Sequence, residues 1–129
     1  MLIPHVTLLY GGLVGLLILG LGLNVTRVRG QHGNWYESTP PPKPLYMAIR
    51  AHGNAIEWTP ITVILILAIE LAGGSSTWLH VLGGSMVAAR VMHAVGMLTA
   101  VKLGVIGATL MYGVVGGAGG WALWIHFVK

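Results

Sequence analysis

Four long apolar segments occupy most of this chain of 129 residues, and they constrain its fold more than any other feature. We place them at about residues 4–25, 45–72, 78–97 and 103–127. An α-helix of about 20 apolar residues is long enough to cross the ~30 Å hydrocarbon core of a bilayer. The pattern therefore predicts an all-α fold, an integral membrane four-helix bundle that forms a single domain over residues 1–129.

The composition excludes several other classes of protein. With 55% hydrophobic residues, a mean hydropathy of +0.79, seven basic and three acidic side chains, the chain cannot cover a soluble surface. The basic residues stand at segment ends and form no basic stripe, so we do not expect nucleic-acid binding. The absence of cysteine excludes disulfides, thiolate metal sites and a cysteine nucleophile. The first segment lacks a basic leader and a cleavage site, which favours a retained membrane helix over a signal peptide.

The distribution of basic residues predicts how the chain is oriented in the membrane. Glycines and three consecutive prolines favour an extended loop at 26–46, whereas the turn at 73–77 is short and uncharged. Lys102 lies between the third and fourth segments. The positive-inside rule then places loop 26–46 and Lys102 in the cytoplasm and both termini outside, in the inner membrane if the source is a bacterium. The basic residues in or near the loop are Arg27, Arg29, Lys43 and Arg50.

Pairs of glycines four residues apart occur in the first and last segments. Such spacing allows two membrane helices to approach closely, so it predicts tight helix packing at these positions. The pairs are Gly11 and Gly15, Gly113 and Gly117, and Gly116 and Gly120.

Polar residues concentrate at the start of the second segment, in the stretch RAHGNAIEWTP at 50–60. On a helix, Arg50, Asn54 and Glu57 share one face. In an antiparallel hairpin with the third segment, Arg90 and His93 reach the same depth. Because an unpaired charge in hydrocarbon costs at least ~2.5 kcal/mol, we expect Glu57 to lie between Arg50 and Arg90, with Asn54 bridging.

Two interpretations of this group are open. A buried arginine–glutamate pair can serve only to fix helix register. Two arginines facing one carboxylate nevertheless leave surplus positive charge, which suits an anionic ligand with carboxylates of its own. The histidines are not spaced for metal binding, and we predict no metal site. For Glu70, near the outer boundary, we expect a solvated or structural role.

The stretch RAHGNAIEWTP, the ARVMH block at 89–93 and TRVR at 26–29 resemble the MAPEG family, the membrane-associated proteins of eicosanoid and glutathione metabolism, and its small bacterial branch in particular. The resemblance covers nearly the whole chain. It implies four-helix protomers assembled as a homotrimer. It also implies that glutathione binds as a co-substrate between subunits, near the cytoplasmic face.

The resemblance also implies which residues hold glutathione. The family's glutamate on the second helix contacts the amino end of glutathione, and its arginine contacts the carboxylates. One arginine at the end of the first helix, here Arg27, is supplied by the neighbouring subunit. The glutathione-binding residues implied in this way are Arg27, Arg50, Asn54, Glu57, Arg90 and His93.

Three positions depart from the catalytic members of the family. Where those members carry an arginine and a tyrosine on the fourth helix, this chain has Ile106 and Leu110, and the third-helix tyrosine is replaced by Met97. A free thiol has a pKa of about 8.5 and needs a nearby cation or donor to ionise at neutral pH. Lys102 and Arg90 are therefore the candidate catalytic residues.

Three functions compete at this point. The first is a glutathione transferase or peroxidase that acts on lipophilic electrophiles from the bilayer. Its partners would be further copies of the same chain, membrane lipids and that substrate. The second is a non-catalytic lipid- or thiol-binding scaffold like the lipoxygenase-activating branch. A transporter or channel ranks last, because the first and fourth segments offer almost no polar residues across the membrane.

Overall fold

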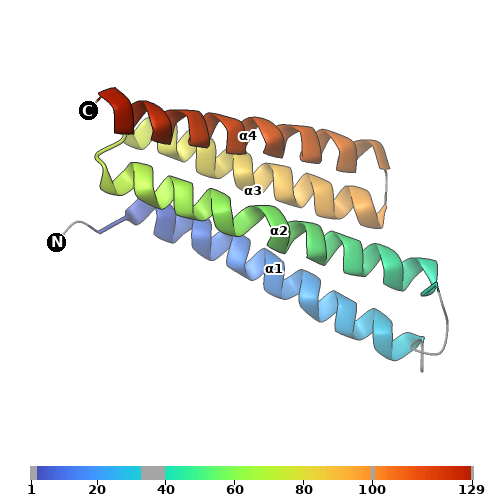
Figure 1. Ribbon diagram of the computed structural model, residues 1–129. Helices are drawn as coiled ribbons and strands as arrows, with labels where there is room; N and C mark the ends of the chain where they lie inside the picture. Colours follow the sequence, from blue (N-terminus) through green and yellow to red (C-terminus); the bar gives the residue numbers. More distant parts are fainter. Residues whose placement is uncertain (1–2, 33–39, 100, 129) are drawn as a thin grey trace.

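The computed structural model describes residues 3–32, 40–99 and 101–128. Within them the chain forms four helices in sequence: α1 (His5–Gln31), α2 (Lys43–Leu71), α3 (Ser76–Leu98) and α4 (Val101–Val128). The helices run alternately up and down in one bundle, so that α1 begins and α4 ends at the same end (Figure 1). Each helix is long and apolar enough to cross a membrane. The predicted all-α fold of four membrane-spanning helices is confirmed.

The prediction for the end of the first helix was wrong. Helices α2, α3 and α4 begin and end within two residues of their predicted bounds, whereas α1 continues from Val25 to Gln31. Two features explain the extension. Val25 and Val28 are buried in one cluster with Leu45 and Ala48 of α2, and the prolines follow only after Thr39. The remainder of the predicted loop, at 33–39, lies outside the described residues.

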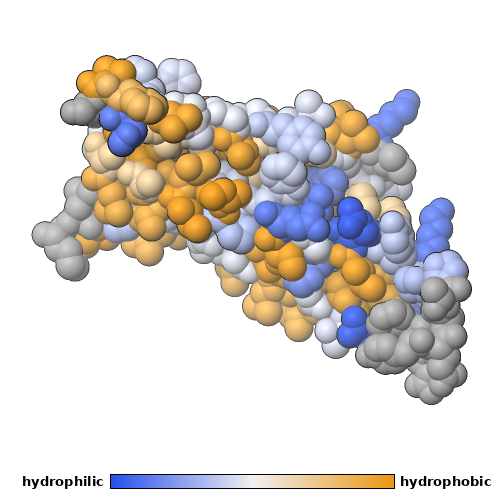
Figure 2. Space-filling view, in the orientation of Figure 1, coloured by the Kyte–Doolittle hydropathy of each residue, from blue (hydrophilic) through white to orange (hydrophobic). Residues whose placement is uncertain are grey.

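Helices α1 and α2 are longer than a bilayer requires. At ~1.5 Å per residue they measure about 40 Å and about 43 Å, against ~30 Å of hydrocarbon. Figure 2 shows hydrophilic residues gathered on the half of the visible face where α1 ends and α2 begins, while the other half is mainly hydrophobic. The excess length therefore carries the polar residues to one membrane boundary.

The main core lies toward the opposite half of the bundle. Ile66 of α2, Leu79 and Met86 of α3, and Met111 of α4 are almost completely buried there, together with Val14 of α1. Buried threonines on α2 complete this core, and their hydroxyl groups are not exposed to lipid. Thr62, for example, donates a 2.8 Å hydrogen bond to the backbone oxygen of Trp58.

The closest helix contact is between α3 and α4, and glycines make it possible. A Cβ atom at Gly96 would overlap the backbone of Gly104, and one at Gly107 would lie 2.6 Å from the backbone oxygen of Ala89. The predicted glycine pairs are not the close contacts within this chain. A Cβ at four of their six positions would meet nothing within 4 Å, and at Gly11 and Gly117 it would meet only one side-chain atom at ordinary distance. Spacing alone does not tell which face of a helix meets its neighbour within the chain, and tight packing of these glycines against a neighbouring copy stays a prediction.

Glu70 has a structural role at the other end of the bundle. Its two carboxylate oxygens accept hydrogen bonds of 2.8 Å from the backbone N–H groups of Val6 and Thr7, and one oxygen accepts a 2.6 Å bond from the Thr7 hydroxyl. The first N–H groups of a helix have no partner within the helix and carry partial positive charge. The carboxylate on α2 therefore caps the first turn of α1.

Candidate functional site

A buried arginine forms the base of the candidate site. Arg90 on α3 is only 2% exposed, and its Nη1 donates to Asn54 of α2 at 2.7 Å from Oδ1 and 3.4 Å from the backbone oxygen. Its Nε atom is buried without a hydrogen-bond partner in the part of the chain described here. This hydrogen bond brings the polar residues of α2 and α3 together, as the antiparallel hairpin predicts in general terms.

Arg50 and Glu57 lie on the outer face of α2. Both side chains are exposed, whereas Asn54 is half-buried at the edge of that face. Among residues 3–32, 40–99 and 101–128 no ion pair joins Glu57 to either arginine. The expected placement of Glu57 between Arg50 and Arg90 was therefore wrong. Asn54 lies nearer the buried face, and its side-chain oxygen accepts the hydrogen bond from the Arg90 guanidinium instead.

His93 turns toward α4 and contacts the backbone there. Its Nδ1 atom lies 2.9 Å from the backbone oxygen of Gly104. This contact is possible because the glycines at 96, 104 and 107 bring the two helices together. The side chain thus belongs to the interface between α3 and α4, one helical turn beyond Arg90.

A pocket of about 260 Å³ opens beside His93. Its lining combines apolar surface with three groups able to form hydrogen bonds, on His93, Thr109 and Tyr112. Tyr112 is 58% exposed, and its ring packs edge-on against Trp58 of α2, with centroids 5.2 Å apart. The complete lining is His93, Met97, Gly104, Val105, Ala108, Thr109 and Tyr112.

Sequence reasoning missed Tyr112, although a signal for it was present. Residues 105, 108, 109 and 112 recur at helical spacing and form one face of α4. The positions at which catalytic members of the family carry an arginine and a tyrosine are Ile106 and Leu110 here. These two side chains are 56% and 37% exposed and do not line the pocket.

Lys102 and Arg27 lie apart from this pocket. Lys102 is exposed in the first turn of α4. Arg27 is exposed on α1, and its Nη2 donates a 2.9 Å hydrogen bond to Oδ1 of Asn24. In the described chain neither residue forms a hydrogen bond or ion pair with the other predicted site residues, so their roles stay predictions.

His52 does not belong to the outer stripe of α2. Its ring packs over Gly22 of α1, with Nε2 3.4 Å from where a Cβ of that glycine would stand. In the described parts of the chain, no three histidine or acidic side chains come close enough to hold a metal ion.

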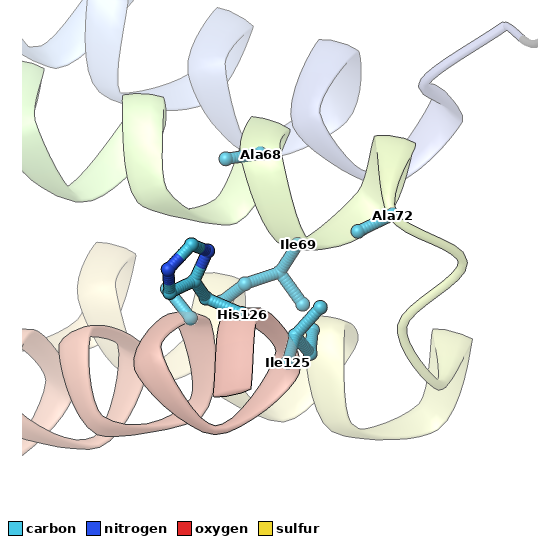
Figure 3. A pocket seen from close by; sticks show the side chains of 6 residues that line it. Ala68, Ile69, Ala72, Ile125 and His126 are labelled. Atoms are coloured by element: carbon cyan, nitrogen blue, oxygen red, sulfur yellow. The ribbon is translucent and has the colours of Figure 1, made fainter. Parts of the chain in front are cut away.

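A second pocket, of about 240 Å³, lies at the far end between α2 and α4 (Figure 3). Ala68, Ile69 and Ala72 face Ala122 and Ile125 across it, and His126 supplies the one polar group among its lining residues. A single imidazole in an apolar pocket offers no set of converging polar groups. The candidate site is therefore the α2–α3–α4 region around Arg90, His93 and the first pocket.

Comparison with known proteins gives one match. The model of the MAPEG family matches residues 7–124, which include every predicted site residue. No curated protein and no solved structure is detectably similar to the chain.

Proposed function

Because this chain belongs to the MAPEG family, we propose that it is a glutathione-binding integral membrane protein that conjugates glutathione to lipophilic electrophiles, or reduces them with it. The family includes glutathione transferases and peroxidases, along with other members. The proposal assigns glutathione to the outer face of α2 and the lipophilic substrate to the bilayer side.

The observation that carries this proposal is the exposure of Arg50 and Glu57 on an apolar helix. Neither has an ion-pair partner within the described chain, and each lies near the level of the buried Arg90. An unpaired charge near hydrocarbon costs at least ~2.5 kcal/mol. Glutathione carries two carboxylates and an ammonium group, so it can pair with both an arginine and a glutamate.

A neighbouring copy of the chain completes the proposed site. Arg50 and Glu57 face outward, and Arg27 is exposed on α1. In a homotrimer, Arg27 of one subunit meets the α2 face of the next, and the bound glutathione is enclosed between them. Enclosure excludes water and strengthens each ion pair.

The proposed chemistry begins with the thiol. Lys102 and Arg90 are the proposed cations that stabilise the thiolate. Arg90 donates a hydrogen bond to Asn54, so it is suited to holding the site in position. Lys102 is exposed and has a long, flexible side chain. The pocket beside Tyr112 is largely apolar and would take the electrophile next to the sulfur.

One observation favours the scaffold as a second candidate. No lysine or arginine lines the pocket, and the exposed Ile106 and Leu110 stand where catalytic relatives carry an arginine and a tyrosine. A protein of this kind would bind the thiol or a lipid without chemistry.

Calorimetry with the protein purified in mild detergent tests the proposal. We expect glutathione to bind with measurable heat, S-methylglutathione to bind with similar affinity, and an added aryl halide to be conjugated. No heat and no thermal shift at millimolar glutathione would exclude glutathione binding. Heat without conjugation would favour the scaffold.

A further inference from the structure

The hydrogen bond of His93 determines which of its ring nitrogens carries a proton. Nδ1 lies 2.9 Å from the backbone oxygen of Gly104, and a carbonyl oxygen can only accept. Nδ1 must therefore be the N–H donor. In the neutral ring, Nε2 then has a free lone pair.

That lone pair is accessible to a ligand. Nε2 is not buried, and it has no hydrogen-bond partner in the described chain. His93 lines the pocket that also contains Tyr112, whose hydroxyl forms no hydrogen bond with the described residues. A base and a phenolic donor thus share one pocket, and Tyr112 packs against Trp58, which follows Glu57 on α2.

Accordingly, we propose that Nε2 of His93 accepts the proton of the bound thiol and that the Tyr112 hydroxyl donates a hydrogen bond to the resulting thiolate. This inference rests on the proposed function and adds the residues that activate the sulfur. The S–H bond breaks, its electron pair stays on sulfur, and the proton forms an N–H bond at Nε2. The imidazolium is stabilised by the Gly104 oxygen, which still accepts from Nδ1.

The same proton completes an addition reaction. When the thiolate adds to an activated carbon–carbon double bond, the new S–C bond leaves an anion on the substrate, and the imidazolium returns its proton there. Arg90, one turn away on α3, Tyr112 in the same pocket and Lys102, two residues before Gly104 on α4, are titratable groups on the elements packed around His93. The buried Arg90 supplies positive charge that favours the thiolate, and its bond to Asn54 keeps it in place.

The mechanism differs from activation by a lysine or arginine in a measurable way. If His93 keeps the thiol proton, the thiolate forms at neutral pH without releasing a proton to solution. If a permanent cation alone lowers the thiol pKa, one proton is released for each thiolate. Thiolate is followed by its ultraviolet absorbance on adding glutathione, and protons are counted with a pH indicator in weak buffer.

Two variants and their matched controls complete the test. His93→Asn keeps a side-chain N–H for the Gly104 oxygen but removes the base, so the thiolate signal should disappear and conjugation should slow by about 100-fold. Tyr112→Phe should lower the thiolate fraction by about tenfold. His80→Asn and Tyr10→Phe change a histidine and a tyrosine that contact each other at the opposite end, 3.1 Å apart, and should change neither signal.

The outcomes separate this inference from the proposed function. Thiolate formation with a full proton released, or an undiminished thiolate in His93→Asn, would overturn the role of His93. Glutathione binding without any thiolate in the unmodified protein would also overturn it, while leaving glutathione binding intact. Absence of glutathione binding would overturn both proposals.

Discussion

The Nη1 atom of Arg90 lies 2.7 Å from Oδ1 of Asn54, so that an amide on α2 holds a guanidinium buried on α3. The chain contains a second arginine–asparagine contact, between Arg27 and Asn24, at 2.9 Å on the exposed side of α1. The two contacts have similar lengths and differ in burial, and the first joins two helices while the second lies within one. They therefore allow the effect of burial to be measured.

Asn54→Ala should lower the free energy of unfolding by about 2–3 kcal/mol, because it leaves the buried guanidinium with only the 3.4 Å contact to the backbone oxygen of residue 54. Asn24→Ala should change it by less than about 0.5 kcal/mol, since water replaces the lost contact. Denaturant titration in mild detergent provides both values. Equal losses in the two variants would mean that Arg90 reaches water or a lipid headgroup instead.

The outer face of α2 should determine glutathione affinity. Arg50→Ala or Glu57→Ala should weaken binding by about 2 to 5 kcal/mol, since each removes one partner of an ion pair enclosed between subunits. Lys43→Ala, at the exposed start of the same helix, is the control and should leave the affinity unchanged. Calorimetry measures all three. A loss of binding free energy below ~0.5 kcal/mol in both site variants would mean that Arg50 and Glu57 have a structural role and do not hold glutathione.

Removing the cap of α1 should affect stability and leave glutathione binding unchanged. Glu70→Ala should cost about 1–2 kcal/mol, as loss of a helix cap does, and should speed amide exchange at Val6 and Thr7. Thr7→Val removes one of the three hydrogen bonds and should cost less. Unchanged exchange at both amides in Glu70→Ala would show that water caps the helix equally well.

Alanine substitutions should distinguish, by their effect on stability, the glycines at the α3–α4 contact from those in the predicted pairs. Gly96→Ala should destabilise the protein by about 1–3 kcal/mol through overlap with the Gly104 backbone. Gly116→Ala, in one of the predicted pairs and with nothing within 4 Å of the added Cβ, should be neutral or stabilising by about 0.5–1 kcal/mol. Thermal unfolding would compare them. If Gly96→Ala left the stability unchanged, α3 and α4 would have to be further apart than the contact between Gly96 and Gly104 allows.

Membrane orientation can be tested because the chain has no cysteine. Cysteines placed at His32 and Ser76, both exposed, should react with a membrane-impermeant reagent from opposite sides, the first from the cytoplasm. Labelling from the same side would overturn the predicted orientation.

The sequence was sufficient for the four helices, apart from the end of α1, and for bringing Asn54 and Arg90 together from neighbouring helices, because hydropathy and helical spacing are local properties. It did not predict the partners of those residues. Whether Arg90 meets Glu57 or Asn54 depends on the rotation of α2 against α3, which is set by packing of the whole interface. Tyr112 was missed for a related reason: its place in the pocket follows from how closely the glycines allow α4 to approach α3.

The contact between Glu70 and the start of α1 also bears on how the protein is made. The carboxylate stands 64 residues after Val6 in the chain. During synthesis from the N-terminus, α1 emerges first, and its leading amides meet their carboxylate only when α2 has been made and has turned back beside it. A capped first turn therefore marks a chain whose first hairpin has assembled.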